Sequence, residues 1–290
     1  MRRREFLLGT AMAAGGVRTT WGQDSDKAKR ARIGSMTANF DRVIKDPARP
    51  DDPNRTLDLL DLPQMYAERL GVHYIEPTCA HFASTEKDYL DEFKARLKKA
   101  GLELNQISLG ALATVPGARF PLLSISAPER THRVQAIDLI KQWIDHAAYL
   151  GCPRVMVHQG ELPPEVRKET IEAMKIVTDY GKTKNVKATI ELRSSDWHVI
   201  VEVLKGAGGW TNCHTQNPPE ALSVMLPMSS GSTHVTYGAG RGRSNTQYNL
   251  HDAIQLFKQA GYRGIYSIEH SGPDPYAAVQ TVVDALVKEI

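Results

Sequence analysis

The sequence predicts an α/β fold made of a single closed (β/α)8 barrel. Short apolar runs typical of buried strands alternate with amphipathic stretches of helical period over residues 31–290. Helical stretches end at Gly71, Gly101, Gly151 and Gly261, and the next apolar run begins within three residues of each glycine. Such alternation indicates a parallel sheet, and the length is close to the ~250 residues of one eight-fold barrel. An open doubly wound sheet is less favoured, because no Gly-x-Gly-x-x-Gly motif follows the first predicted strand.

Eight strands and eight helices are expected in strict alternation. The strands, which show continuous or period-2 apolar runs, are predicted at 31–36, 72–77, 102–108, 154–158, 187–192, 210–214, 232–236 and 264–269. The helices, which show a period of 3.6, are predicted at 57–70, 87–100, 128–150, 164–182, 196–205, 218–226, 250–260 and 276–288. A Ser-Ser-Asp cap opens the fifth helix, and a proline opens the sixth.

The first residues resemble a Tat-type export signal rather than part of the barrel. Arg2, Arg3 and Arg4 precede a short apolar stretch, residues 6–16, that ends in small residues. This stretch is far shorter than the about 20 residues that cross a bilayer as a helix, so no stable membrane insertion is expected after signal removal. We therefore divide the chain into a signal peptide and linker, residues 1–30, and a barrel, residues 31–290. The protein is expected to be periplasmic or otherwise exported.

Charge and cysteine content narrow the possible partners. The formal net charge is +3, and the arginines of residues 1–23 account for all of it. The neutral remainder lacks the concentrated positive field on which non-specific nucleic-acid binding depends, so no nucleic-acid partner is expected. The three cysteines, Cys79, Cys152 and Cys213, are odd in number and widely spaced, so they imply no disulfide framework.

Four predicted strands in the second half of the chain each end in a residue able to bind a metal. These residues are Glu191, His214, His234 and Glu269. The C-terminal ends of parallel barrel strands converge on the face where such barrels carry out chemistry. Two carboxylates and two imidazoles meeting there would form a cation site with an acid or a base on either side of a bound sugar.

Several segments resemble the sugar phosphate isomerase/epimerase family, the xylose-isomerase-like TIM barrels of the endonuclease IV superfamily. The matching segments are 70–77, which contains Glu76, and 147–158, 186–191 and 261–270. The last is the most specific, because a Gly-Tyr-x-Gly turn followed by a strand ending in Glu is typical of the family's final unit. The resemblance implies metal ligands at Glu191, His234 and Glu269.

The sixth predicted strand departs from the family pattern. The family has Asp-x-Gly-Asn where this chain has His214-Thr-Gln-Asn217, and Thr236 and Tyr237 stand where Lys-Asp often follows the histidine. We expect His214 to take the ligand position of the missing aspartate. An imidazole in place of a carboxylate favours Mn, Zn, Co or Fe over Mg as the divalent metal cofactor.

The chemistry expected of this site is proton abstraction next to a carbonyl through an enediolate, with Glu191 and Glu269 as the acid and base pair. The enediolate has three possible fates. Return of the proton to the opposite face of the same carbon epimerises the sugar, and return to the adjacent carbon isomerises it. Loss of a hydroxyl group instead gives an elimination product. The leading interpretation is an exported sugar isomerase or epimerase. A lyase or hydratase on keto-sugars and a catalytically silent carbohydrate-binding barrel stay open. A nuclease of the endonuclease IV type is disfavoured by the neutral charge.

A sugar partner needs further contacts, and possible ones lie in segments after the strands. The expected substrate-binding residues are Glu76, His158, Arg193, Arg241 and Arg243. The two later arginines lie in a Gly-Ala-Gly-Arg-Gly-Arg segment after the seventh strand, where a cation would orient the substrate. A homodimer is possible, but no periodicity in the sequence tests it.

Overall fold

The structure, a computed structural model, describes most of the chain. The described residues are 20–47, 49–110, 124–157, 159, 162–191, 197–237 and 249–290, with the backbone alone described for 20–24. Within these ranges, no helix is long and apolar enough to cross a membrane.

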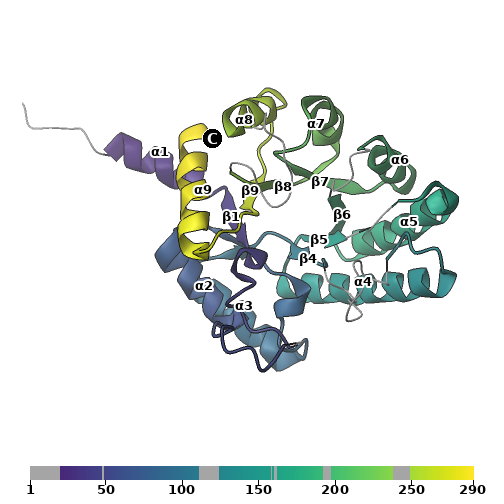
Figure 1. Cartoon of the computed structure of the whole chain (residues 1–290), viewed down its shortest axis with the longest axis horizontal. Helices are drawn as coiled ribbons and strands as arrows, with labels where there is room; N and C mark the ends of the chain where they lie inside the picture. Colours follow the sequence, from purple (N-terminus) through teal and green to yellow (C-terminus); the bar gives the residue numbers. More distant parts are fainter. Residues whose placement is uncertain are drawn as a thin grey trace, which may run out of the picture.

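All described strands form one parallel sheet that curls into a barrel, and the helices surround it (Figure 1). The strands are β1 Ile33–Met36, β2 Tyr74–Glu76, β3 Glu103–Leu104, β4 Ile107–Ser108, β5 Arg154–Val157, β6 Lys187–Glu191, β7 Trp210–His214, β8 Ser229–Val235 and β9 Ile265–Ile268. Their order in the sheet is β3-β2-β1-β9-β8-β7-β6-β5-β4. All eight predicted strands are therefore confirmed, and the predicted (β/α)8 barrel is correct.

The third predicted strand is divided into two short pieces. The first piece, β3, pairs with β2, and the second piece, β4, pairs with β5. The two pieces together therefore connect β2 and β5 in the barrel. Asn105 and Gln106 lie between the pieces, both fully buried. Their amide side chains point into the barrel, where they bond to polar partners. The apolar run of the sequence did not predict this break.

The predicted helices are confirmed, with changes at their ends. The helices of the barrel are α2 Leu62–Met65, α3 Lys87–Ala100, α4 Arg130–Leu150, α5 Arg167–Thr183, α6 Trp197–Ala207, α7 Pro219–Met225, α8 Leu250–Gln259 and α9 Pro275–Glu289. The first predicted helix, 57–70, is irregular: a 3-10 turn precedes α2 and a π-helical turn, Tyr66–Leu70, follows it. Gly71 ends this turn at a φ of 60°, a left-handed conformation that glycine adopts without strain.

A further helix, α1 Thr20–Arg30, precedes β1 and lies beside α9 (Figure 1). Its last turn is attached to the barrel, because Lys29 Nζ donates to the carbonyl oxygen of Val287 at 2.7 Å. Arg30 likewise donates to the carbonyl oxygen of Leu70 at 3.3 Å. The sequence placed this segment in the linker, and the arginines of the predicted export signal lie outside the described residues.

The sheet separates an apolar layer from a polar interior. Strand residues that face the helices, such as Ile75, Ile190 and Ile268, are fully buried in the hydrophobic core. The alternate residues point into the barrel and are largely polar. They include Glu76, Thr189, Glu191, Asn212, Ser232, His234 and Ser267, each at most 1% exposed. Interiors of such barrels are usually filled by branched apolar side chains, so this polar interior marks the functional end of the fold.

Close packing of α5 against the start of β6 sets the position of the strand that ends in Glu191. A Cβ added to Gly181 would lie 2.3 Å from the carbonyl oxygen of Val186. We expect Gly181→Ala to lower the free energy of unfolding by at least about 2 kcal/mol, because backbone must move. Gly101→Ala is the matched control: it meets no atom within 4 Å and has only an unfavourable φ of +69°, worth about 1 kcal/mol. Urea denaturation measures both, and equal losses would contradict this account of the packing.

Candidate functional site

Glu191, His234 and Glu269 meet at the C-terminal ends of the strands. Glu191 ends β6, His234 lies near the end of β8, and Glu269 directly follows β9. One ligand atom from each lies within 4.8 Å of the other two. The backbone N–H of Glu269 donates to the carbonyl oxygen of Val235 at 2.8 Å, so the ladder between β8 and β9 fixes its position. We call these three residues the carboxylate–imidazole group.

His234 is the centre of this group and has no exposed surface. Its Nδ1 lies 2.9 Å from Glu191 Oε1 and 3.3 Å from Glu269 Oε2. Its Nε2 lies 2.9 Å from Oε1 of Glu76. Burial alone would lower the pKa of this imidazole, but the surrounding carboxylates of Glu76, Glu191 and Glu269 outweigh burial and raise the pKa well above its ordinary value. In the metal-free protein these carboxylates therefore favour the protonated ring, whose Nδ1 faces Glu191 and Glu269 and whose Nε2 faces Glu76.

Glu76, the last residue of β2, lies against Nε2 of His234 and is fully buried. Besides the imidazole, three side chains donate to its carboxylate: Ser267 at 2.6 Å, Gln106 at 2.8 Å and Asn105 at 3.0 Å. In the sheet, β1 and β9 separate β2 from β8, so Glu76 reaches His234 across the barrel interior. The carboxylate thus fixes the plane and the Nε2 proton of His234. It has no solvent contact in the structure, and its predicted contact with substrate stays a prediction.

Glu269 is the more open carboxylate, with 26% of its side chain exposed. Burial raises the pKa of this carboxyl, but the neighbouring rings of His214 and His234 outweigh burial and hold the pKa well below its usual range. Glu191 is 1% exposed. The group therefore has a solvent-facing carboxylate at one side and a buried carboxylate at the other.

His214 lies next to this group but is not part of it. Its Nε2 is 3.5 Å from Glu269 Oε2, while its Nδ1 accepts the backbone N–H of Gln216 at 3.1 Å. Asn217 Oδ1 accepts the backbone N–H of His214 at 2.8 Å, so Asn217 forms the turn after β7. Of the four metal ligands that the sequence predicts, the structure gathers Glu191, His234 and Glu269 and leaves His214 at the edge.

The fold and part of the sequence match known proteins. The family model described as xylose isomerase-like TIM barrel matches residues 65–205. The chain therefore has the fold of a xylose isomerase-like TIM barrel. None of the curated proteins matches its sequence.

Solved structures of the same fold cover nearly the whole barrel. A xylose isomerase domain protein from Planctomyces limnophilus is 18% identical, with a TM-score of 0.66 over 89% of this chain and 96% of that chain. D-allulose 3-epimerase from Methylomonas sp., solved in complex with D-allulose, is 14% identical, with a TM-score of 0.68 over 90% of this chain and 98% of that chain. A xylose isomerase-like TIM barrel protein from Mycobacterium smegmatis, solved in complex with magnesium, is 16% identical, with a TM-score of 0.62 over 89% and 96%. At these identities the likeness concerns the fold.

The carboxylate–imidazole group of this xylose isomerase-like barrel fits a divalent cation. Two carboxylates and one imidazole nitrogen are donors that such ions accept. The second nitrogen of His234 donates to Glu76, which is how proteins usually orient a metal-binding histidine. A dication bound here would replace the Nδ1 proton of His234 as the positive charge among the carboxylates.

Four of the predicted substrate-binding residues, His158, Arg193, Arg241 and Arg243, lie outside the described residues. Conversely, sequence reasoning missed the polar residues under His234, namely Asn105, Gln106 and Ser267. A signal for them exists, because Asn105-Gln106 interrupts an apolar strand and Ser267 has the same period-2 phase as Glu269.

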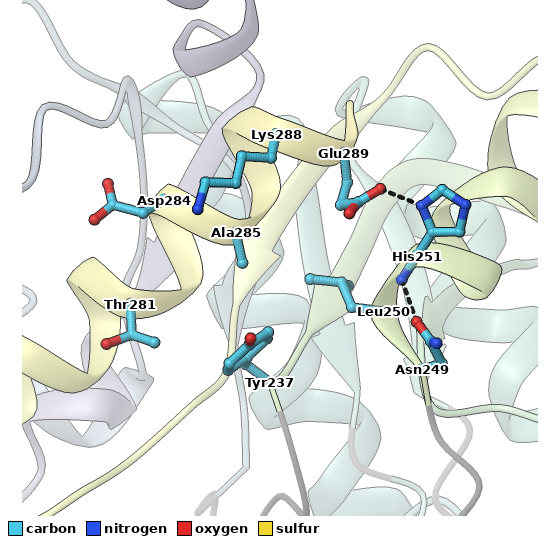
Figure 2. Close-up of a pocket in the computed structure, with 9 residues that line it drawn as sticks. All are labelled: Tyr237, Asn249, Leu250, His251, Thr281, Asp284, Ala285, Lys288 and Glu289. Carbon is cyan, nitrogen blue, oxygen red and sulfur yellow. Dashed lines mark hydrogen bonds and ion pairs between the residues drawn. The ribbon is translucent and has the colours of Figure 1, made fainter.

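A separate surface pocket of about 400 Å³ lies between α8 and α9 on the outside of the barrel (Figure 2). Tyr237 lies at its edge, and an exposed ion pair joins His251 Nδ1 to Glu289 Oε2 at 2.6 Å. The pocket shares no residue with the carboxylate–imidazole group. We therefore assign the chemistry to the barrel end rather than to this pocket.

The raised pKa of His234 predicts how the stability of the metal-free protein depends on pH. The folded ring keeps its proton where the unfolded ring loses it, so its stabilisation is complete below pH 6.5 and is lost as pH rises through the raised pKa. Above pH 6.5 this loss should reach up to about 1.4 kcal/mol per pH unit. The lowered pKa of Glu269 has the opposite effect. Its stabilisation of the fold is fully present above pH 4.5 and is lost as pH falls through the lowered pKa of the folded state. The two groups together therefore contribute most to the free energy of unfolding between pH 4.5 and pH 6.5.

Urea denaturation in a chelating buffer at pH 6.5, and at about one and two pH units above it, measures this dependence. His234→Gln should lack the decline, whereas the surface variant His251→Gln should keep it. An equal decline in His234→Gln and the unaltered protein would show that His234 is not the titrating group.

Proposed function

We propose that this barrel is a divalent-metal-dependent sugar isomerase or epimerase that removes a proton next to a carbonyl. The observation that carries the proposal is the meeting of Glu191, His234 and Glu269 within 4.8 Å at the strand ends, with the Glu269 side chain 26% exposed. The fold likeness to D-allulose 3-epimerase and to a barrel in complex with magnesium supports it.

Glu191, His234 and Glu269 would hold the ion, and we propose Mn, Zn, Co or Fe rather than Mg. An imidazole nitrogen suits the former ions, whereas Mg prefers oxygen donors. When bound, the ion would polarise the carbonyl oxygen and acidify the neighbouring C–H bond. Glu76 keeps the Nε2 proton of His234 in place, so that Nδ1 faces the ion.

The two glutamates would move the proton. One carboxylate takes the proton from the carbon beside the carbonyl, and the C–H electron pair becomes the enediolate. The other glutamate, in its protonated form, returns a proton to the opposite face, which inverts the carbon. The net result is inversion of one centre and an exchange of protonation between the glutamates. Glu269 is the group that solvent can reset, because it is the exposed member of the pair.

We also propose that the protein is exported through a Tat-type route, on the evidence of Arg2, Arg3 and Arg4 ahead of the apolar stretch. Changing all three arginines to lysine should retain the protein in the cytoplasm, because the route reads arginine and not charge alone. Cell fractionation measures the distribution, with Arg18→Lys as control. Equal periplasmic amounts of the triple variant and the unaltered protein would refute the export proposal.

Glu269→Gln tests the proton-transfer role directly. We expect exchange of a substrate C–H proton with deuterated water to fall by at least about 100-fold, because the amide cannot act as a base. NMR over a panel of hexoses and their 3-keto derivatives measures this exchange. Glu202→Gln, on the exposed face of α6, is the control and should retain the original rate.

Circular dichroism checks that the Glu269→Gln protein is folded. Exchange at the original rate in this folded variant would rule out Glu269 as the base. Absence of exchange with every sugar in the unaltered, metal-loaded protein would instead count against the isomerase proposal.

A further inference from the structure

The turn after β7 fixes the ring of His214 through its backbone. Asn217 Oδ1 accepts the backbone N–H of His214 at 2.8 Å, and the backbone N–H of Asn217 donates to the carbonyl oxygen of His214 at 2.9 Å. Within this closed turn, the backbone N–H of Gln216 points at Nδ1 of His214 at 3.1 Å. The side chain of His214 is 6% exposed, so water competes little with these bonds.

These contacts determine where the ring of His214 carries its proton. A backbone N–H can only donate, so Nδ1 must offer its lone pair to Gln216. The proton of the neutral ring therefore lies on Nε2, which faces Glu269 Oε2 at 3.5 Å. His214 is thus arranged as a donor toward the exposed carboxylate.

The same contacts oppose a ligand role. Nδ1 faces the backbone N–H of Gln216 and is turned away from the carboxylate–imidazole group. Coordination through Nε2 would move the ring proton to Nδ1, where it would oppose the N–H of Gln216. Two donors would then face each other in a buried turn, with a hydrogen bond lost. His214 also supplies no atom to the set of ligand atoms within 4.8 Å of one another.

We propose that His214 is a positioning residue that donates Nε2–H to Glu269, and that the metal has only Glu191, His234 and Glu269 as protein ligands. This inference rests on the proposed metal-dependent function. It replaces the ligand role that the sequence suggested for His214. With three protein ligands, the ion would keep coordination positions for substrate oxygens and water. Substrate oxygens would approach on the side of Glu269, whose carboxylate His214 holds in place.

Titration of Mn²⁺ into chelator-treated protein by calorimetry tests the number of ligands. We expect His214→Gln to bind Mn²⁺ within about threefold of the unaltered protein, because no metal bond is lost and the amide of Gln can still donate to Glu269. His234→Gln, the matched ligand variant, loses a metal bond and should lose at least about tenfold in affinity. Equal losses in both variants would overturn the inference, whereas absence of Mn²⁺ binding by the unaltered protein would overturn the proposed function itself.

A second measurement needs no substitution of His214. In Zn²⁺-loaded protein labelled with ¹⁵N-histidine, the NMR pattern of His214 should show a protonated Nε2 and an unprotonated Nδ1. The Nε2–H signal should shift in the Glu269→Gln variant, a response that a residue with a purely structural role in the turn would not give. The reverse pattern, with a proton on Nδ1 and a metal on Nε2, would overturn the inference.

Discussion

Three carboxylates surround one buried imidazole ring, and this charge arrangement constrains the rest of the barrel. Glu76, Glu191 and Glu269 all approach His234 to within 3.3 Å. Carboxylates this close to one another repel strongly in a medium of low dielectric constant, so the group needs a positive charge at its centre. A proton on His234 supplies it in the metal-free protein, and a divalent ion would supply more. The same electrostatics thus favours both the raised pKa of His234 and affinity for a cation.

A chain of polar side chains supports this group from below. Asn105 donates to Glu76 Oε2, and the Oδ1 of Asn105 accepts from Arg154 at the start of β5. Arg154 also donates to the backbone carbonyl of Ser230, so the chain of bonds ends on β8, the strand that holds His234. A buried network of this kind is costly when one partner is missing, and it holds its members in one arrangement when all are present. The apolar layer between sheet and helices supplies the stability that such an interior does not.

The sequence was sufficient to predict the strands and three of the gathered side chains. Alternation of apolar runs determines which strand ends share a face, so the fold class places Glu191, His234 and Glu269 together, and the family resemblance marks them as ligands. The ring orientation of His214 could not be predicted in this way, because it depends on the hydrogen bonds of one turn, Gln216 N–H above all. The end of a strand suggests a substrate contact for Glu76, but its four donors come from β8, β9 and the break between β3 and β4, which the sequence does not bring together. The helix α1 was not predicted, since its attachment depends on α9, more than 250 residues away in the sequence.

The unequal exposure of Glu191 and Glu269 bears on how the two could share one reaction. Glu191 is 1% exposed, and its Oε1 accepts from the imidazole of His234, whereas 26% of the Glu269 side chain is open. A proton placed on Glu269 can exchange with water, but a proton placed on Glu191 is shielded by the ring and the strand ends. In the two-glutamate scheme each turnover takes the sugar proton onto one carboxylate and delivers a different proton from the other, so both carboxylates must regain their starting protonation before the next turnover. That step would be fast at Glu269 and slow at Glu191, which follows from burial rather than from the identity of the sugar.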